Sequence, residues 1–198
     1  MKRIVFIVLL FISSVSLAQT SYIIDKKGTK LYVRDDATEV ILIDKRISYV
    51  LVGKTWEKYV KFDDLDYAAI GSSVLKSFNL NHKKKSQVYF IYGQKEDKQL
   101  IGVAVTVTST SGNMSSSRTF YELYVIDNDQ NIIEELKMDD SKSKDDVEKR
   151  AKIAPMIKKY FSDCPDIMSK LQDNEGSDER NMTILGFLHN TKYINCKQ

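Results

Sequence analysis

The chain has 198 residues, of which 42% are hydrophobic and 29% charged, with 30 Lys and Arg against 27 Asp and Glu. Eight glycines and two prolines exclude a collagen-like chain and a proline-rich disordered one. The length suits one domain, or one domain with an appendage, and the near-balance of charge argues against a nucleic-acid-binding protein.

The N-terminus has the three-part pattern of a secretory signal peptide. Lys2 and Arg3 precede an apolar run over residues 4–12, and the tripeptide SLA at 16–18 fits an A-x-A-like cleavage site. The apolar run is shorter than the about 20 residues that a membrane-spanning helix needs. We therefore predict cleavage after Ala18 and a secreted or periplasmic mature chain without a transmembrane helix. Removal of the two cations leaves 28 basic against 27 acidic side chains, a net charge of +1, so no nucleic-acid partner is expected.

Most of the first two thirds of the chain alternates with the period of a β-strand. Segments 40–44 and 46–53 are rich in β-branched and aromatic residues, which strands favour. In the segment WEKYVKF the alternation predicts a half-buried strand with Trp56, Val60 and Phe62 pointing inward.

An antiparallel meander is predicted further along the chain. It follows the segment FDDLDYAAIG at 62–71, whose acids ahead of an apolar patch indicate a turn or a short helical turn. Turn residues in GQKEDK and DNDQ separate apolar strands as in β-hairpins. The Ser-rich stretch STSGNMSSSR fits the tip of a long hairpin between two of these strands. The predicted meander contains the strands 87–93, 100–108, 118–126 and 131–138.

The hydrophobic period becomes helical after residue 143. Ser143 and Asp146 resemble a capping box, with Asp in place of the usual Glu. Pro155 removes one backbone hydrogen bond and predicts a kink just before it. A second short helix is predicted to begin with Asp163 as N-cap and Pro165 in its first turn. The apolar face of the first helix contains Val147, Ala151, Ala154, Ile157 and Phe161.

The mature chain has two cysteines, Cys164 and Cys196, which allow a single intramolecular pairing. In an oxidising compartment we predict a disulfide that ties the C-terminal tail to the start of the second helix. A nucleophilic Cys164, with its pKa lowered at a helix N-terminus and with His189 as base, is the alternative. No metal site is predicted, because the two cysteines and two histidines include no closely spaced ligand pair.

Few other residues suggest a site. Asp63, Asp64 and Asp66 offer paired carboxylates for acid–base chemistry or a hard cation, but calcium loops require more oxygen ligands and a turn glycine. Trp56 and Tyr59 join these acids as the candidate binding residues. Phosphate-binding loops, Gly-x-Ser-x-Gly elbows and HExxH motifs are absent, and we predict no catalytic residue and no cofactor.

Three stretches carry a resemblance to known proteins. GKTWEKYVKFDDLDYA at 53–68, SSSRTFYELYVIDN at 115–128 and KKYFSDCPDIMSKL at 158–171 resemble small exported proteins of unknown function from Bacteroidetes-type bacteria. The resemblance implies a secreted or periplasmic bacterial protein and assigns no catalytic residue.

We therefore predict an α+β fold: a meander-rich antiparallel sheet, or a partly open barrel, with C-terminal helices packed on it. Residues 1–18 form the signal peptide, 19–140 the β region, and 141–198 the helical segment closed by the disulfide. Whether residues 181–189 form a helix or a strand stays open, since a short apolar run fits both. The predicted function is an exported non-enzymatic module that binds an unknown protein or supports the cell envelope. A carrier of a small hydrophobic ligand, with an enclosed cavity of at least about 300 Å³, and a hydrolase that uses the Asp cluster or Cys164 with His189 are the alternatives.

Overall fold

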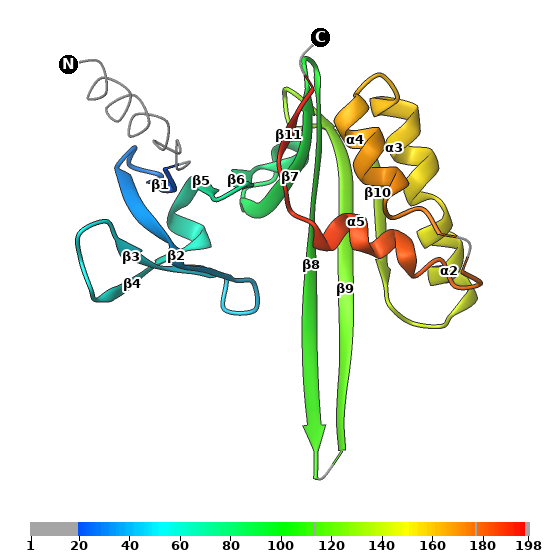
Figure 1. Cartoon of the computed structure of the whole chain (residues 1–198), viewed down its shortest axis with the longest axis horizontal. Coiled ribbons are helices and arrows are strands. Elements are labelled where there is room, and N and C mark those ends of the chain that lie inside the picture. The colour runs from blue at the N-terminus through cyan, green and yellow to red at the C-terminus, as the bar shows by residue number, and fades with distance from the viewer. Residues whose placement is uncertain (1–19, 113, 177, 197–198) are drawn as a thin grey trace, which may run out of the picture.

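A computed structural model describes residues 20–112, 114–176 and 178–196. The signal peptide predicted for residues 1–18 lies outside the described residues. The structure is dominated by one large antiparallel sheet, and its α-helices lie in the C-terminal part of the chain (Figure 1).

Ten strands form this sheet in the order β10-β9-β8-β7-β6-β5-β1-β2-β3-β4. An eleventh strand, β11, pairs with β7 in parallel. No pairing between the end strands β10 and β4 closes the sheet in the part of the chain that the structure describes. The strands are β1 (Tyr22–Asp25), β2 (Lys30–Ile41), β3 (Arg46–Leu51), β4 (Glu57–Lys61), β5 (Leu65–Ile70), β6 (Ser73–Phe78), β7 (Gln87–Lys95), β8 (Lys98–Ser111), β9 (Met114–Asp127), β10 (Ile132–Asp139) and β11 (Ile194–Asn195).

The predicted four-strand meander is confirmed as β7 to β10, and the Ser-rich stretch is the tip of the β8–β9 hairpin. The prediction for 62–71 is half wrong. Its first residues form the 3-10 helix η1 (Phe62–Asp64), but the rest is strand β5. β5 contains two adjacent buried alanines, Ala68 and Ala69, that pack into different clusters on opposite faces of the sheet. Because both faces are covered, the period of two disappears from its hydrophobic pattern.

The C-terminal helices form where predicted, but the predicted apolar face is only partly right, because Ala151 is exposed. Ser143 caps α2, accepting a hydrogen bond from the Asp146 N–H, and the helical run breaks at Lys152, three residues before Pro155. The second N-cap was predicted one residue too early: it is Cys164, with Pro165 at the first helical position. Residues 183–189 are helical. The helices are α2 (Lys144–Ala151), α3 (Ile153–Phe161), α4 (Pro165–Gln172), α5 (Gly186–His189) and the 3-10 helices η2 (Leu80–His82) and η3 (Thr183–Leu185).

The main core lies between one face of the sheet and helices α3, α4 and α5. Its fully buried members include Leu100 and Leu123 from the sheet and Ile157, Phe161 and Phe187 from the helices. A smaller cluster on the other face contains Phe78, Tyr89, Ile91, Ile101 and Tyr124.

The loop around η2 is tied to the β9–β10 turn next to this second cluster. The N–H groups of Asn79 and Asn81 donate to Gln130, and the Asn81 side chain accepts from the Ile132 N–H. These bonds hold Leu80, which is buried, in the second cluster.

The β8–β9 hairpin extends beyond the end of every other strand (Figure 1). Pairing of β8 with β7 ends at Gly102, and pairing of β9 with β10 ends at Phe120. Six residue pairs of the hairpin, from Thr106↔Thr119 to Ser111↔Met114, lie beyond both limits. We call the segments Thr106–Ser111 and Met114–Thr119 the arm; at the strand rise it is about 20 Å long.

Candidate functional site

The C-terminal tail is fastened to the sheet and to α4. Cys164 and Cys196 form a disulfide with Cα atoms 5.4 Å apart, as predicted. The Cys196 N–H donates to the Gln94 carbonyl at 2.8 Å, which continues the pairing of β11 with β7. Gly93 of β7 allows α4 to pack closely on the sheet, since a Cβ atom at this position would lie 2.2 Å from Cδ1 of Ile167. The disulfide thus links the C-terminal tail covalently to the start of α4.

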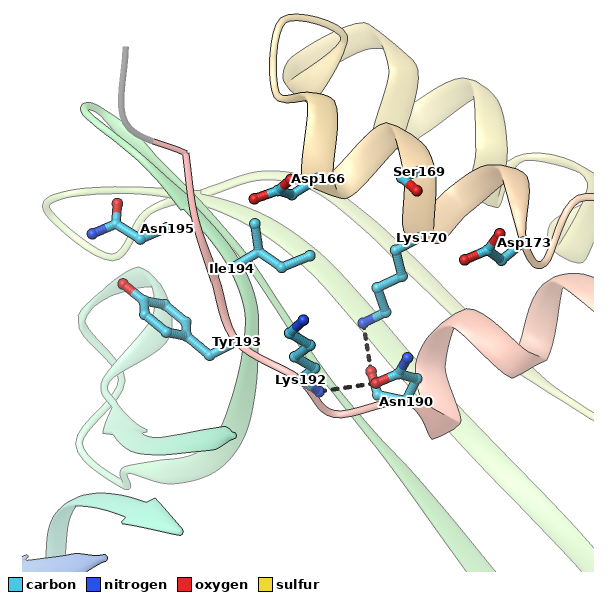
Figure 2. Close-up of a pocket in the computed structure, with 9 residues that line it drawn as sticks. All are labelled: Asp166, Ser169, Lys170, Asp173, Asn190, Lys192, Tyr193, Ile194 and Asn195. Carbon is cyan, nitrogen blue, oxygen red and sulfur yellow. Dashed lines mark hydrogen bonds between the residues drawn. The ribbon is translucent and has the colours of Figure 1, made fainter. Parts of the chain in front are cut away.

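A polar pocket of about 350 Å³ lies between α4 and this tail (Figure 2). Its wall on one side is α4, and on the other the extended segment that leads from α5 to β11. The lining residues are Asp166, Ser169, Lys170, Asp173, Asn190, Lys192, Tyr193, Ile194 and Asn195.

Lys170 is the unusual member of this lining, because its side chain is only 6% exposed. Its amine donates to the carbonyl of Asn190 and lies 4.7 Å from the centre of the Tyr92 ring and 4.2 Å from that of Phe187. Burial, with a smaller contribution from the charge of Lys192, lowers the pKa of this amine to about 7. Among the ion pairs of the described residues, none involves Lys170.

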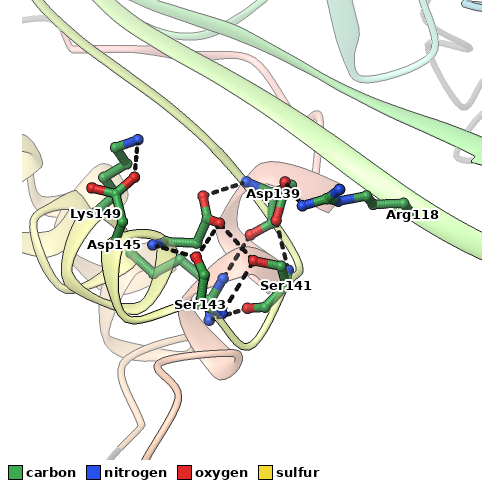
Figure 3. Close-up of polar contacts among 8 residues, drawn as sticks. Arg118, Asp139, Ser141, Ser143, Asp145 and Lys149 are labelled. Atoms are coloured by element: carbon green, nitrogen blue, oxygen red, sulfur yellow. Dashed lines mark hydrogen bonds and ion pairs between the residues drawn. The ribbon is translucent and has the colours of Figure 1, made fainter.

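A second polar cluster joins β10 to α2 (Figure 3). The carboxylate of Asp146 accepts hydrogen bonds from the hydroxyls of Ser141 and Ser143, each at 2.5 Å, and from the Asp139 N–H at 3.2 Å. Burial opposes ionisation of this carboxyl, but these hydrogen bonds outweigh it and hold the pKa of Asp146 well below its usual range. The capping box is therefore part of a larger buried network.

Arg150 completes this cluster and is fully buried. Its guanidinium donates to three backbone carbonyls: Nη1 to Asp139 at 2.6 Å, Nη2 to Ser141 at 2.9 Å and Nε to Arg180 at 2.9 Å. Nearby, Arg118 of β9 reaches the carboxylate of Asp139 at 2.5 Å. These contacts fasten the last turn of α2 to the end of β10, to Ser141 just before α2 and to the loop at Arg180.

The arm has different surroundings. Of its residues only Thr119 is partly buried; the rest are exposed. On one face, hydroxyl pairs join the two strands, Thr106 to Thr119 at 2.9 Å and Thr108 to Ser117 at 2.8 Å. The other face presents Val107, 46% exposed, and Met114, 81% exposed.

Each strand of the arm has a neighbouring strand on one side only, among the residues that the structure describes. The outer edges therefore present unpaired backbone N–H and C=O groups. Arg118 is the single charged residue of the arm, and it lies on β9; β8 carries no charge from Leu100 to Ser111.

The predicted binding residues do not converge on a site. Trp56 was expected to point inward with Val60, which is buried, but its side chain is 53% exposed just before β4, close to the ammonium of Lys54. Tyr59 is also exposed, and the Arg46 guanidinium lies 5.6 Å from the centre of its ring. Because Trp56 precedes the strand, the alternation of β4 does not extend to it.

The acids and the histidine considered for catalysis also lie apart from any catalytic arrangement. Asp63, Asp64 and Asp66 are exposed on η1 and β5. Among the described residues, no three His, Cys, Asp or Glu side chains are close enough together to hold a metal ion. The His189 imidazole interacts with the Tyr121 hydroxyl at 3.0 Å, and Cys164 is oxidised in the disulfide. Asp163, predicted as an N-cap, instead forms an ion pair with Lys95.

Sequence reasoning missed Lys170 and Arg150, although their positions carried a signal. Lys170 follows Ile167 by three residues, and Arg150 follows Val147 by three, so each continues the inward stripe of its helix. A cation on such a stripe indicates a buried charge that needs carbonyl, carboxylate or aromatic partners.

Comparison with models of protein families, with curated proteins and with solved structures gave no match for this chain. No helix in the described ranges combines the length and the apolar character needed to cross a bilayer.

Proposed function

We propose that the chain is an exported, non-enzymatic binding module whose arm pairs with an extended segment of a partner protein at the cell envelope. The signal-peptide pattern of residues 1–18 supports export, and so does the disulfide, because such bonds persist in oxidising compartments. The resemblance to small exported bacterial proteins agrees with this assignment.

The observation that carries the proposal is the arm itself. A two-stranded ribbon that projects into solvent buries little apolar surface, so it adds little to the stability of the fold. The pairing of its two strands is nevertheless regular out to the tip, and two cross-strand hydroxyl pairs support it in the half nearest the sheet. An ordered ribbon with open edges is the type of surface to which an extended peptide adds as a further strand.

The β8 edge is the better docking edge of the two. Natural sheets protect exposed edges with charged residues, proline or bulges. The β8 segment Val103–Ser111 contains no charge and no proline, and its pairing with β9 is regular to the tip. The β9 edge carries Arg118, and at its base the Thr119 carbonyl already accepts from the Asp140 N–H at 3.1 Å. The matching partner is an extended segment with uncharged side chains.

Neither alternative function has a specific observation in its favour. The space between the sheet and the helices is filled by the side chains of the main core. The pocket beside Lys170 opens to solvent and is lined mostly by polar residues, unlike the enclosed apolar cavity of a carrier. For a hydrolase, Cys164 is not a free thiol and His189 has a tyrosine as its partner.

Site-specific photo-cross-linking in the producing cell tests the proposal. A photoreactive residue at Thr108 on the arm is compared with one at Glu148, which is exposed on α2, and one at Tyr59, which is exposed on the end strand β4. We expect one defined protein adduct from Thr108, identified by mass spectrometry, and none from the other two positions. The same adduct from Glu148, an adduct from Tyr59 alone, or an adduct with a second copy of this chain would overturn the proposal.

A further inference from the structure

The pocket beside α4 contains a chemical group that the proposed binding function does not use. Lys170 extends from α4 toward Asn190, while Asp166 and Asp173 project from the same helix on either side of it (Figure 2). A buried ammonium ion is costly unless it is paired with an anion. Here the amine has one carbonyl acceptor and two aromatic ring faces, which is much less than a carboxylate would provide.

The titratable groups near the amine provide no anion that pairs with it. Lys192 lines the same pocket and adds a like charge. Tyr92, which lies beneath the amine, is uncharged because burial raises the pKa of its phenol, and its hydroxyl donates to the Leu188 carbonyl at 2.9 Å. Asp166 and Asp173 are exposed, and neither forms an ion pair with Lys170. A lysine that is desolvated or adjacent to another cation is an activated nucleophile.

We propose that Lys170 is a reactive amine that captures a small hydroxyaldehyde in this pocket as an imine. The lone pair of Nζ attacks the carbonyl carbon to give a carbinolamine. The carbon–oxygen bond then breaks, the oxygen leaves as water together with both amine hydrogens, and a carbon–nitrogen double bond remains. No oxidant or reductant takes part, and water reverses the step.

The lining of the pocket selects the class of carbonyl compound. The volume of about 350 Å³ suits a small molecule, since ligand pockets begin near about 300 Å³. Ser169, Asn190 and Asp173 supply a hydroxyl, an amide and a carboxylate to the lining of the pocket, and such groups bind hydroxyl groups of a ligand. Asp166 and Asp173 offset the positive charge of Lys192 in the lining, so an anionic oxo acid gains no electrostatic advantage over a neutral hydroxyaldehyde.

The proposal is tested by reductive trapping with glycolaldehyde and cyanoborohydride on the folded, disulfide-bonded chain, followed by peptide mapping. At pH 7 we expect Lys170 to acquire a hydroxyethyl group at least about tenfold faster than Lys84, which is exposed, because burial lowers the pKa of the Lys170 amine to about 7. The labelling rate at Lys170 should saturate with glycolaldehyde concentration and rise with pH through a midpoint near 7. In denaturant the two lysines should react equally.

Two variants separate a built site from chance reactivity. Lys192→Gln removes the neighbouring cation from an exposed position and should slow labelling of Lys170 at pH 7 severalfold, with the pH midpoint moved upward. Asp173→Asn should weaken the saturation without moving the midpoint. Labelling of Lys170 that is no faster than that of Lys84, or that rises linearly with glycolaldehyde concentration, would overturn the proposal.

Discussion

The part of the sheet that the helices cover and the arm satisfy their polar groups in opposite ways. Near α2 the buried guanidinium of Arg150 satisfies three carbonyls, and near α4 a disulfide ties the chain end to the helix start. Along the arm, β8 and β9 continue for six residue pairs with no third strand beside them in the described structure. The contrast indicates that stability resides in the helix-covered part of the sheet, which leaves the arm free to serve another purpose.

The largest expected effect is in the helix-covered part of the sheet, from Arg150→Met. Removal of the guanidinium leaves three backbone carbonyls without their partners, and loss of such a buried network typically costs about 3–5 kcal/mol. We expect a decrease of that size in the free energy of unfolding, measured with urea. Arg180→Met is the matched control, because its side chain is exposed and only its carbonyl takes part. A difference below about 1 kcal/mol between the free energies of unfolding of the two variants would show that the Arg150 contacts do not stabilise the fold as proposed.

The disulfide comes next. Loss of a bond that closes a loop with a sequence separation of 32 residues should cost about 3–4 kcal/mol in the chain-entropy model. The double variant Cys164→Ser, Cys196→Ser should show this cost, and reduction of the natural protein should reproduce it. Hydrogen exchange should accelerate at β11 and at Gln94 and stay unchanged in the arm. Equal acceleration in the arm would contradict the separation of the two regions.

A smaller effect with a defined pH dependence is expected from Asp146→Asn. The pKa of Asp146 is lowered in the folded state, so its ionised form stabilises the fold above the unfolded pKa of about 4, and this contribution is lost as the pH falls below that value. At pH 7 the variant should be less stable by about 1–3 kcal/mol. Urea unfolding at pH 7 and pH 3 should show the difference shrink at low pH.

The matched control for this prediction is Asp145→Asn in the same helical turn. Asp145 is exposed and pairs only with Lys149, so its replacement should cost less than about 1 kcal/mol. If both variants lose the same free energy of unfolding, the buried network around Asp146 contributes no more to stability than an exposed acid in the first turn.

The smallest effect is expected in the arm. Thr108→Val removes the hydroxyl pair with Ser117 but keeps a β-branched side chain. Because both residues are exposed, the free energy of unfolding should change by less than about 0.5 kcal/mol. A loss above about 1 kcal/mol would show that the arm stabilises the fold and would contradict the contrast between the two regions.

The sequence predicted those features whose cause is local. Turn residues and alternation predicted the meander from β7 to β10, and the spacing of Ser143 and Asp146 predicted the cap of α2. Long-range packing explains the failures. Strand β5 is covered on both faces, so its alanines carry no period, and no local rule shows that it pairs with β1.

The candidate sites were less predictable than the fold. The disulfide followed from counting two cysteines, whereas the pocket beside Lys170 needs α4, α5 and the tail to meet in space. The open edges of the arm depend on where β7 and β10 stop pairing, near Gly102 and Phe120. No turn residue marks the places where these pairings stop. The length of the unpaired ribbon was therefore visible only in the structure.

The central claim, that the β8 edge of the arm is the binding edge, is tested most directly with two opposed lysines. Ser109 and Ser116 are cross-strand partners, so Ser109→Lys and Ser116→Lys place the same charge at the same depth on the β8 and β9 strands. The yield of the photo-cross-link from Thr108 is measured in each variant. The account predicts loss of the adduct with Ser109→Lys and its retention with Ser116→Lys; equal yields, or loss with Ser116→Lys alone, would contradict it.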